Sequence, residues 1–176
     1  PLVTIARRFL MKALTLAIVL VLPLAAGPLL AAGSGNETAP EKPKCEDGQV
    51  YDKKTKTCVD AQDSRLDMDS LYETVRELAY AGRYADAQVV LAEMPQDDDR
   101  TLTYLGFTHR KMGQTDLAMG YYQRALAVNP ANVLARSYMG QGFVAEGKVA
   151  DAMEQLKAIR AHGGSGTWAE ASLRQA

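Results

Sequence analysis

The sequence predicts an all-α fold: three helical hairpins and a short C-terminal capping helix, preceded by a small disulfide-closed hairpin. One observation is a self-match at a constant interval, in which Leu105-Gly106, Gly113, Ala118 and Ala125 recur as Met139-Gly140, Gly147, Ala152 and Ile159. A second is a looser upstream copy at a slightly shorter interval, in which Leu71, Leu78, Gly82, Ala87 and Leu91 precede Leu102, His109, Gly113, Ala118 and Tyr122. The third is that apolar residues within each unit recur every three or four positions, which is helical spacing.

Residues 1–33 are typical of a secretory signal peptide. Met11-Lys12, with Met11 a candidate for the true start, opens an apolar run over 13–22, and the segment ends in small residues at 31–33. We therefore expect export to the periplasm. A retained membrane anchor is the less favoured alternative, because Pro23 and Pro28 interrupt the run and a spanning helix needs about 20 apolar residues. No stable membrane span is expected after cleavage.

Residues 34–44 are rich in Gly, Pro, Glu and Lys, and predict a disordered linker. Residues 45–60 follow as a cysteine hairpin. Cys45 and Cys58 are the only two cysteines, and an isolated pair in an exported chain favours a disulfide over a metal site. Short strands at 49–51 and 57–59 flank a polar turn. We expect this hairpin to have almost no core and to be separate from the repeats, so that reduction leaves the melting of the helices nearly unchanged.

The repeat domain is expected over residues 66–164, in units of about 68–98, 99–132 and 133–164. Its predicted helices lie near 68–81, 84–94, 99–112, 116–128, 133–146 and 149–161. Gly82, Gly113 and Gly147 fall between the two helices of their units, where a residue free to take positive φ lets the chain reverse. Pro95 should shorten the second helix. The acidic run at 97–99 is expected to cap the third helix, because a calcium loop needs alternating oxygen ligands.

The order of residues in these units resembles the tetratricopeptide repeat (TPR), which has a period of about 34 residues and the signature W-x2-L-G-x2-Y, then A-x3-F, then P. The interval from Gly106 to Gly140 equals that period. The middle unit matches best, with Leu102-x2-Leu105-Gly106-x2-His109, then Ala118-x3-Tyr122, then Ala125 and Pro130. The third unit keeps Gly140, Phe143, Gly147 and Ala152. The resemblance implies a stack of helical hairpins that bury their apolar faces against one another.

Small residues in the second and third units mark the expected helix contacts. Gly106, Gly140, Ala118 and Ala152 are predicted to lie where two helix backbones approach. Residues 165–176 are expected to form a final helix that covers the end of the stack, with Trp168 as its anchor. Thr167 followed by Glu170 matches a capping box. A frayed tail is the alternative.

The sequence offers no candidate catalytic residue, metal site or cofactor motif, and we expect no enzyme. His109 stands at a position that packs against a partner helix, and His162 lies in a Gly-rich stretch. Removal of residues 1–32 takes away three basic side chains and no acid, which leaves 17 basic against 21 acidic side chains and a net charge of −4. Such a balance argues against nucleic acid as a partner.

The TPR resemblance implies that the concave groove, lined by the first helix of each unit, binds a protein or peptide. The groove residues it implies are Tyr72, Arg76, Tyr80, Thr103, Phe107, Arg110, Lys111, Ser137, Gln141 and Val144. The two-carboxylate clamp of some chaperone-binding members is absent. The function expected is a non-enzymatic protein–protein interaction module of the bacterial cell envelope.

An alternative function places binding in the cysteine hairpin. The pattern Cys45-x2-Gly48-x-Val50-Tyr51-Asp52-x5-Cys58 is similar to half of the motif of small chitin-binding modules, although those carry additional cysteines. In that case the protein would be associated with the cell wall or a glycan, and the repeats would serve as a spacer.

Overall fold

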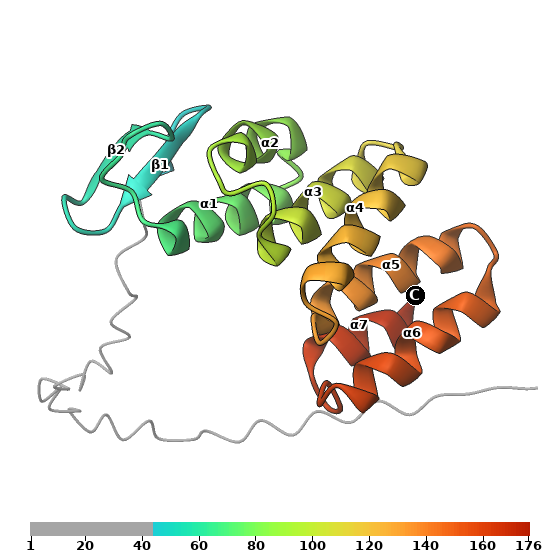
Figure 1. Cartoon of the computed structure of the whole chain (residues 1–176). Coiled ribbons are helices and arrows are strands. Elements are labelled where there is room, and N and C mark those ends of the chain that lie inside the picture. Colours follow the sequence, from blue (N-terminus) through green and yellow to red (C-terminus); the bar gives the residue numbers. More distant parts are fainter. Residues whose placement is uncertain (1–43) are drawn as a thin grey trace, which may run out of the picture. The chain divides into compact units, whose positions relative to one another are not determined.

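The computed structural model describes residues 44–176, so the predicted signal peptide and nearly all of the predicted linker lie outside the described residues. The described part contains two strands followed by seven helices (Figure 1). Their bounds are β1 Gln49–Asp52, β2 Thr57–Asp60, α1 Met68–Tyr80, α2 Tyr84–Ala92, α3 Asp99–Lys111, α4 Thr115–Val128, α5 Val133–Ala145, α6 Val149–Ala161 and α7 Trp168–Gln175. None of the helices described is both long and apolar enough to cross a membrane.

The predicted fold class is confirmed. Helices α1 and α2, α3 and α4, and α5 and α6 form three hairpins, and each predicted helix ends within two residues of the observed one. Helix α1 contacts α3, α3 contacts α5, and α5 contacts α7, so the odd-numbered helices form one layer. We call the surface of this layer that faces away from α2, α4 and α6 the inner face. The glycines at 82, 113 and 147 have φ of 78°, 83° and 73°, which confirms their role in reversing the chain.

Gly106 is required for a different contact from the one predicted. A Cβ atom placed on Gly106 would lie 2.5 Å from the ring of Tyr122 in α4, so the missing side chain makes room for an aromatic ring and not for a second backbone. Gly140 takes the equivalent position in α5, where a Cβ would lie 2.7 Å from Leu173 of α7. The third unit carries Leu156 at the position equivalent to Tyr122. There Leu173 of α7, the helix that follows the third unit, packs against Gly140.

Helix α7 covers the end of the stack, as predicted, but through other residues. Trp168 is 55% exposed, whereas Ala169 and Leu173 are buried against α5 and α6. The predicted anchor is therefore wrong, because the indole lies at the first turn while Leu173 points into the space beside Gly140.

The capping box at the start of α7 does not form. The Thr167 hydroxyl donates to the carbonyl of Gly164 and accepts no bond from the helix. Glu170 instead accepts from the backbone N–H of Gly166 at 2.8 Å and from Arg160 at 2.6 Å. Both side chains thus fix the turn between α6 and α7.

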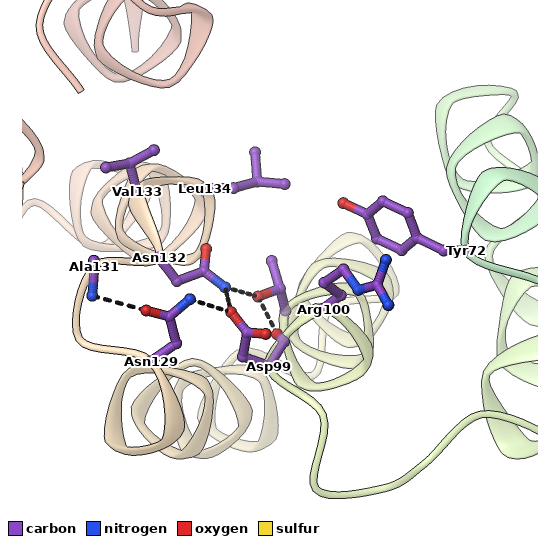
Figure 2. Close-up of a pocket in the computed structure, with 9 residues that line it drawn as sticks. Tyr72, Asp99, Arg100, Asn129, Ala131, Asn132, Val133 and Leu134 are labelled. Atoms are coloured by element: carbon purple, nitrogen blue, oxygen red, sulfur yellow. Dashed lines mark hydrogen bonds between the residues drawn. The ribbon is translucent and has the colours of Figure 1, made fainter. Parts of the chain in front are cut away.

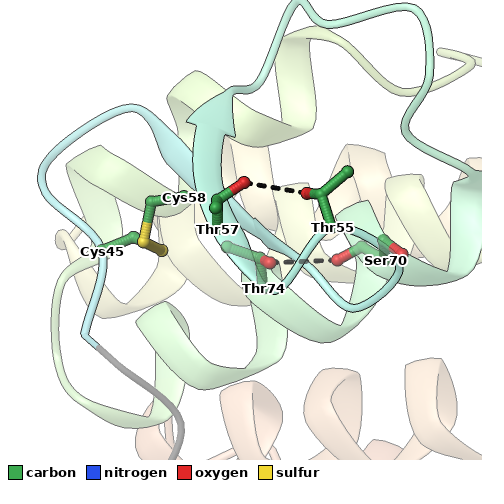
Figure 3. Close-up of a disulfide and its surroundings, with 6 residues drawn as sticks. All are labelled: Cys45, Thr55, Thr57, Cys58, Ser70 and Thr74. Atoms are coloured by element: carbon green, nitrogen blue, oxygen red, sulfur yellow. Dashed lines mark hydrogen bonds between the residues drawn. A yellow bond between two sulfur atoms is a disulfide. The ribbon is translucent and has the colours of Figure 1, made fainter.

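The Cys45–Cys58 disulfide closes the β1–β2 hairpin, as predicted (Figure 3). The hairpin is not separate from the helices, however. Val50 of β1 is fully buried in the same core cluster as Leu71 and Val75 of α1. Ion pairs from Lys53 to Glu73 and from Arg83 to Asp47 join the hairpin to α1 and to the turn before α2. The sequence pattern missed this packing because a single apolar residue on a four-residue strand gives too weak a signal.

We predict that Gly106→Ala destabilises the protein, because the added Cβ would overlap the ring of Tyr122 and overpacking costs about 1–3 kcal/mol. Gly120→Ala is the matched control. Gly120 lies in α4 with nothing within 4 Å of a Cβ placed there, so the change should bring only the gain in helix propensity, about 1 kcal/mol. Urea unfolding measures both variants. Equal stability of the two would show that α4 moves to relieve the contact.

We predict that replacing Cys45 and Cys58 together by serine lowers the melting temperature of the helices. The disulfide closes a loop with a sequence separation of 13, worth about 3 kcal/mol, and loosening the hairpin exposes Val50 and the side of α1 that it covers. Melting followed by the helical circular dichroism signal tests this. An unchanged transition would restore the expectation that the hairpin folds independently.

Candidate functional site

A row of aromatic side chains crosses the layer of odd-numbered helices. It consists of Tyr72 and Tyr80 of α1, Tyr104 and Phe107 of α3, Tyr138 of α5 and Trp168 of α7. Successive rings are close: 5.5 Å between the centroids of Tyr72 and Tyr104, 4.6 Å between Phe107 and Tyr138, and 5.9 Å between Tyr138 and Trp168. We call these six residues the aromatic row. Edge-to-face and tilted pairs at these distances add stabilisation beyond the area they bury.

The aromatic row is buried in its middle and exposed toward both ends. Tyr104, Tyr138 and Phe107 are buried, whereas Tyr80 is 51% exposed and Trp168 is 55% exposed. The hydroxyl of Tyr104 donates to that of Tyr80 at 3.1 Å, and the Tyr80 and Tyr138 hydroxyls lie 2.9 Å apart. These bonds satisfy the two buried phenols and fix the exposed ring of Tyr80 against α3 and α5. The row therefore presents rigid apolar surface to solvent.

A pocket of about 250 Å³ opens beside Tyr72, at the N-terminal ends of α3 and α5 (Figure 2). Asp99 accepts hydrogen bonds from the side-chain amides of Asn129 at 2.7 Å and Asn132 at 2.8 Å. Asn132 also donates to Thr103 at 3.0 Å and caps α5 by accepting from the N–H of Ala135. The polar atoms of this pocket thus bind one another and join the second unit to the third.

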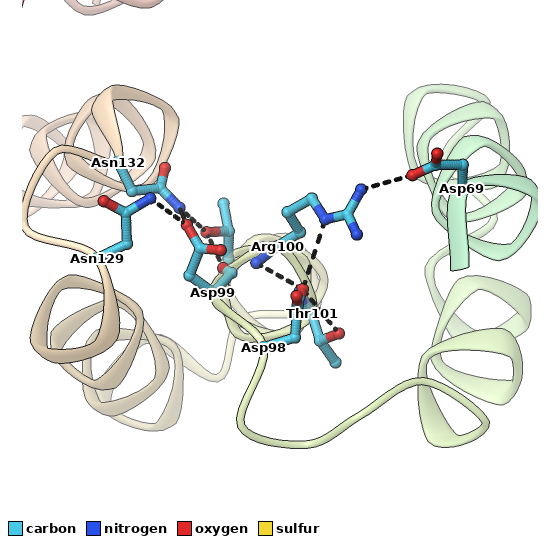
Figure 4. Close-up of polar contacts among 8 residues, drawn as sticks. Asp69, Asp98, Asp99, Arg100, Thr101, Asn129 and Asn132 are labelled. Atoms are coloured by element: carbon cyan, nitrogen blue, oxygen red, sulfur yellow. Dashed lines mark hydrogen bonds and ion pairs between the residues drawn. The ribbon is translucent and has the colours of Figure 1, made fainter. Parts of the chain in front are cut away.

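Arg100 closes the side of the pocket next to α1 (Figure 4). Its guanidinium donates to Asp69 at 2.8 Å, lies 3.6 Å from Asp98 and stands 5.0 Å from the ring centroid of Tyr72. The hydrogen bond to Asp69 raises the pKa of Arg100. Asp98 accepts from the N–H groups of Arg100 and Thr101, so the acidic run caps α3, as predicted.

Three other cations lie along the same helices. Among residues 44–176, neither Arg76, Arg110 nor Lys111 forms an ion pair. Each lies instead beside a ring of the aromatic row. The guanidinium carbon of Arg76 is 5.9 Å from the centroid of Tyr80, and Arg110 and Lys111 are 6.0 Å and 5.7 Å from that of Phe107. Cations at this distance are attracted to an aromatic face.

The residues that the TPR resemblance assigned to the groove fall into two groups. Exposed or half-buried residues are Tyr72, Arg76, Tyr80, Arg110, Lys111, Gln141 and Val144. The other three, Thr103, Phe107 and Ser137, are buried. The buried three support their neighbours, since Thr103 and Ser137 hydrogen-bond Asn132 and Gln141, and Phe107 lies beneath Tyr80 and Tyr138.

The sequence reasoning missed Tyr104 and Tyr138, which form the middle of the aromatic row. A signal was available, because the two tyrosines are separated by the same interval as Gly106 and Gly140 and so repeat with the units. Trp168 was noted, but as a packing residue. The ion pair between Arg100 and Asp69 was also missed, because the two residues belong to different units and their pairing leaves no pattern in a single sequence.

The two histidines show no catalytic arrangement. His109 stacks on Tyr121 of α4, with centroids 5.2 Å apart and planes 7° from parallel, and its Nδ1 hydrogen-bonds Gln114. His162 is exposed after α6. Within residues 44–176 no group of three or more His, Cys, Asp or Glu side chains is arranged to hold a metal ion.

Comparison with known proteins identifies the class of fold. No protein-family model matches the chain, and no curated protein matches it. A solved structure, that of the type III secretion translocator chaperone SycD of Yersinia enterocolitica in an alternative dimer, is similar with a TM-score of 0.52 and 20% sequence identity, over 61% of this chain and 89% of that one. The chain is a TPR-like helical repeat protein. At this identity the likeness establishes the fold alone.

We predict that the protein loses stability as the pH rises from about 10 toward 12. Burial raises the pKa of Tyr122 to about 12, and it raises the pKa of Tyr104 and Tyr138 as well. The folded state therefore retains protons that the unfolded chain releases, so the stability is complete below the ordinary tyrosine pKa and is lost above it. Urea unfolding in a series of alkaline buffers gives the slope of the free energy of unfolding against pH. Tyr122→Phe should make it shallower, and an unchanged slope would mean that Tyr122 does not contribute.

Proposed function

We propose that this protein is a non-enzymatic module of the bacterial cell envelope that binds a protein or peptide partner along the inner face of its repeats. The observation that carries the proposal is the aromatic row, whose exposed rings, Tyr80 and Trp168, extend across the face with the cations of α1 and α3 beside them. Aromatic and arginine side chains dominate binding hot spots. The partner segment would bind along this surface, which corresponds to the concave groove that the TPR resemblance implies.

The partner is expected to be a flexible segment that becomes ordered on binding. The buried middle of the aromatic row holds its rings in place through hydroxyl bonds and ring contacts, so little freedom of the protein is lost when a segment binds. Preorganised apolar surface with nearby donors suits an extended or helical peptide, since donors reach its carbonyl or acidic groups. The similar structure, SycD, is described as a translocator chaperone. A chaperone binds another protein, which is consistent with the role proposed for this chain.

Location in the periplasm is supported by two independent features. The pattern at residues 11–33 is that of an export signal, and the Cys45–Cys58 disulfide suits an oxidising compartment. The proposal assigns His109 a packing role, because its ring stacks on Tyr121 and its Nδ1 atom hydrogen-bonds Gln114.

The alternative of glycan binding by the cysteine hairpin gains no support from the contacts of the hairpin. Val50 packs against the helices, Asp52 binds its own turn through Lys54 and Thr55, and Lys53 pairs with Glu73. These contacts give the hairpin a structural role at the start of the repeats.

The proposal predicts that a partner captured by crosslinking to the mature protein binds less tightly to Tyr80→Ala and Arg76→Ala. Each truncation should cost about 2 kcal/mol, or about thirtyfold in Kd, because both side chains belong to the exposed surface beside the aromatic row. Isothermal titration with the purified partner measures the change, and circular dichroism checks the fold.

Arg124→Ala is the matched control for this experiment. Arg124 is an exposed arginine beside a tyrosine, 5.6 Å from the ring centroid of Tyr121, but it lies on α4 behind the layer of odd-numbered helices. Its loss should leave the affinity unchanged. Equal affinity of the parent, Tyr80→Ala and Arg76→Ala would reject the inner face as the binding surface.

A further inference from the structure

Arg110 is a half-buried cation whose polar atoms are incompletely bonded. Its Cδ atom would lie 3.2 Å from a Cβ placed on Gly142, so the side chain runs along α5. Its Nη2 atom reaches the side-chain oxygen of Gln141 only at 3.4 Å, and its Nε atom is buried without a hydrogen-bond partner among residues 44–176. The fully buried hydroxyl of Tyr122 is the other side-chain atom of the described chain without a hydrogen bond of ordinary geometry. Burial raises the pKa of Tyr122, and the charge and the hydrogen-bonding groups of Arg110 act in the opposite direction, so the inner part of the guanidinium lies toward this phenol.

The fold does not require a charge at this position. The first unit has Ala79 at the equivalent position and the third has Val144, at the same intervals by which the turn glycines of the three units repeat. A cation at the C-terminal end of a helix is favoured by the helix dipole, but α1 and α5 have no basic residue in their last turns. A guanidinium with no acidic partner is unfavourable when partly removed from water. Tyr122, the phenol that Arg110 acts on, is also confined to the second unit, where the first and third units have Leu91 and Leu156. That interaction leaves the outer nitrogens of the guanidinium with one long bond, to Gln141, and it is this end of Arg110 that is available for a ligand.

The surroundings of Arg110 suit a carboxylate. Lys111 adds a second cation, which forms no ion pair with an acidic side chain among residues 44–176. Both Arg110 and Lys111 lie near the ring of Phe107. Gln141 is held in place by bonds from its Nε2 atom to Ser137 at 3.2 Å and to Ser172 at 3.0 Å. A guanidinium presents paired N–H donors that match the two oxygens of a carboxylate, and such bonds are stronger than neutral ones.

We propose that Arg110 and Lys111, with Gln141 orienting Arg110, form a subsite that binds an Asp or Glu side chain of the partner segment. The exposed ring of Tyr80, which lies against Phe107 at 6.2 Å, takes an apolar side chain of the same segment. The proposal rests on the proposed function and specifies the ligand chemistry of that surface: a peptide in which an acidic residue stands near an apolar or aromatic one.

The test uses the mature chain and an array of twelve-residue peptides on an Ala/Ser background. Each peptide carries one Phe and one Glu at varied separation, and each has a twin with Gln in place of Glu. The parent should bind the best Glu peptide at least about tenfold more tightly than its twin, with the difference falling at high salt. Arg110→Gln should remove the preference, Arg110→Lys should keep part of it, and Arg124→Gln should keep all of it.

The outcomes separate the subsite from the proposed function. Equal binding of the Glu and Gln twins by the parent, with both lost in Tyr80→Ala, would overturn the subsite and leave the inner face as the binding surface. A preference for Glu that survives Arg110→Gln would also overturn it.

A measurement without ligand gives a second test. If Arg110 serves a ligand, Arg110→Met should melt at the same temperature as the parent or higher, because an apolar chain of similar length replaces an unpaired charge. A melting temperature lower by about 5 °C or more would assign Arg110 to the stability of the stack and overturn the proposal.

Discussion

The structure depends on the packing of one unit against the next, because a single helical hairpin cannot bury its own apolar face. The units meet where α1 contacts α3 and α3 contacts α5, through ring pairs such as Tyr72 with Tyr104 and Phe107 with Tyr138. Within the second unit, the ring of Tyr122 in α4 occupies the space left by the missing side chain of Gly106 in α3. In the third unit Leu173 occupies the corresponding space beside Gly140, and that leucine comes from α7. The final helix is thus part of the core of the third unit, which would otherwise lack the side chain that fills it.

The same constraint explains why the cysteine hairpin is folded against α1. In the part of the chain that the structure describes, no helical hairpin precedes the first unit, so the side of α1 that would face one is exposed unless another segment covers it. Val50 and Ala61 are buried in the core cluster of α1 and α2 and supply that cover. Two four-residue strands are too short to be stable alone, and the disulfide between Cys45 and Cys58 compensates for their small core. The hairpin and α7 are therefore the two caps that a repeat stack needs for stability and solubility.

Most of the fold could be predicted from the sequence because repetition strengthens each local signal. The glycines at 82, 113 and 147 and the apolar spacing in three units agree with one another, so the helix ends were predicted to within two residues. Single features without a repeat were predicted less well. Thr167 and Glu170 have the spacing of a capping box, but a bond to Gly164 and one to Gly166 compete with it. Trp168 is large and apolar, yet its position on the first turn of α7 leaves it half exposed while Leu173 is buried.

The candidate site was predicted in part, for a related reason. The TPR resemblance identified positions on the inner face, but it could not separate exposed side chains from buried ones, and Phe107 and Ser137 are buried. That distinction arises from the neighbouring units, since Phe107 is covered by Tyr80 from the first unit and Tyr138 from the third. The burial of Phe107 has a consequence for binding. A truncation of Phe107 would disturb the rings that hold Tyr80 in place. The measured loss of affinity would then include both the loss of this support and the loss of any direct contact between Phe107 and the partner. Arg76, an exposed side chain beside the row, reports direct contact with a partner more cleanly, because its removal takes away none of the rings. Removal of Tyr80 also leaves the buried hydroxyls of Tyr104 and Tyr138 without their partner, so its effect on affinity includes a loss of support.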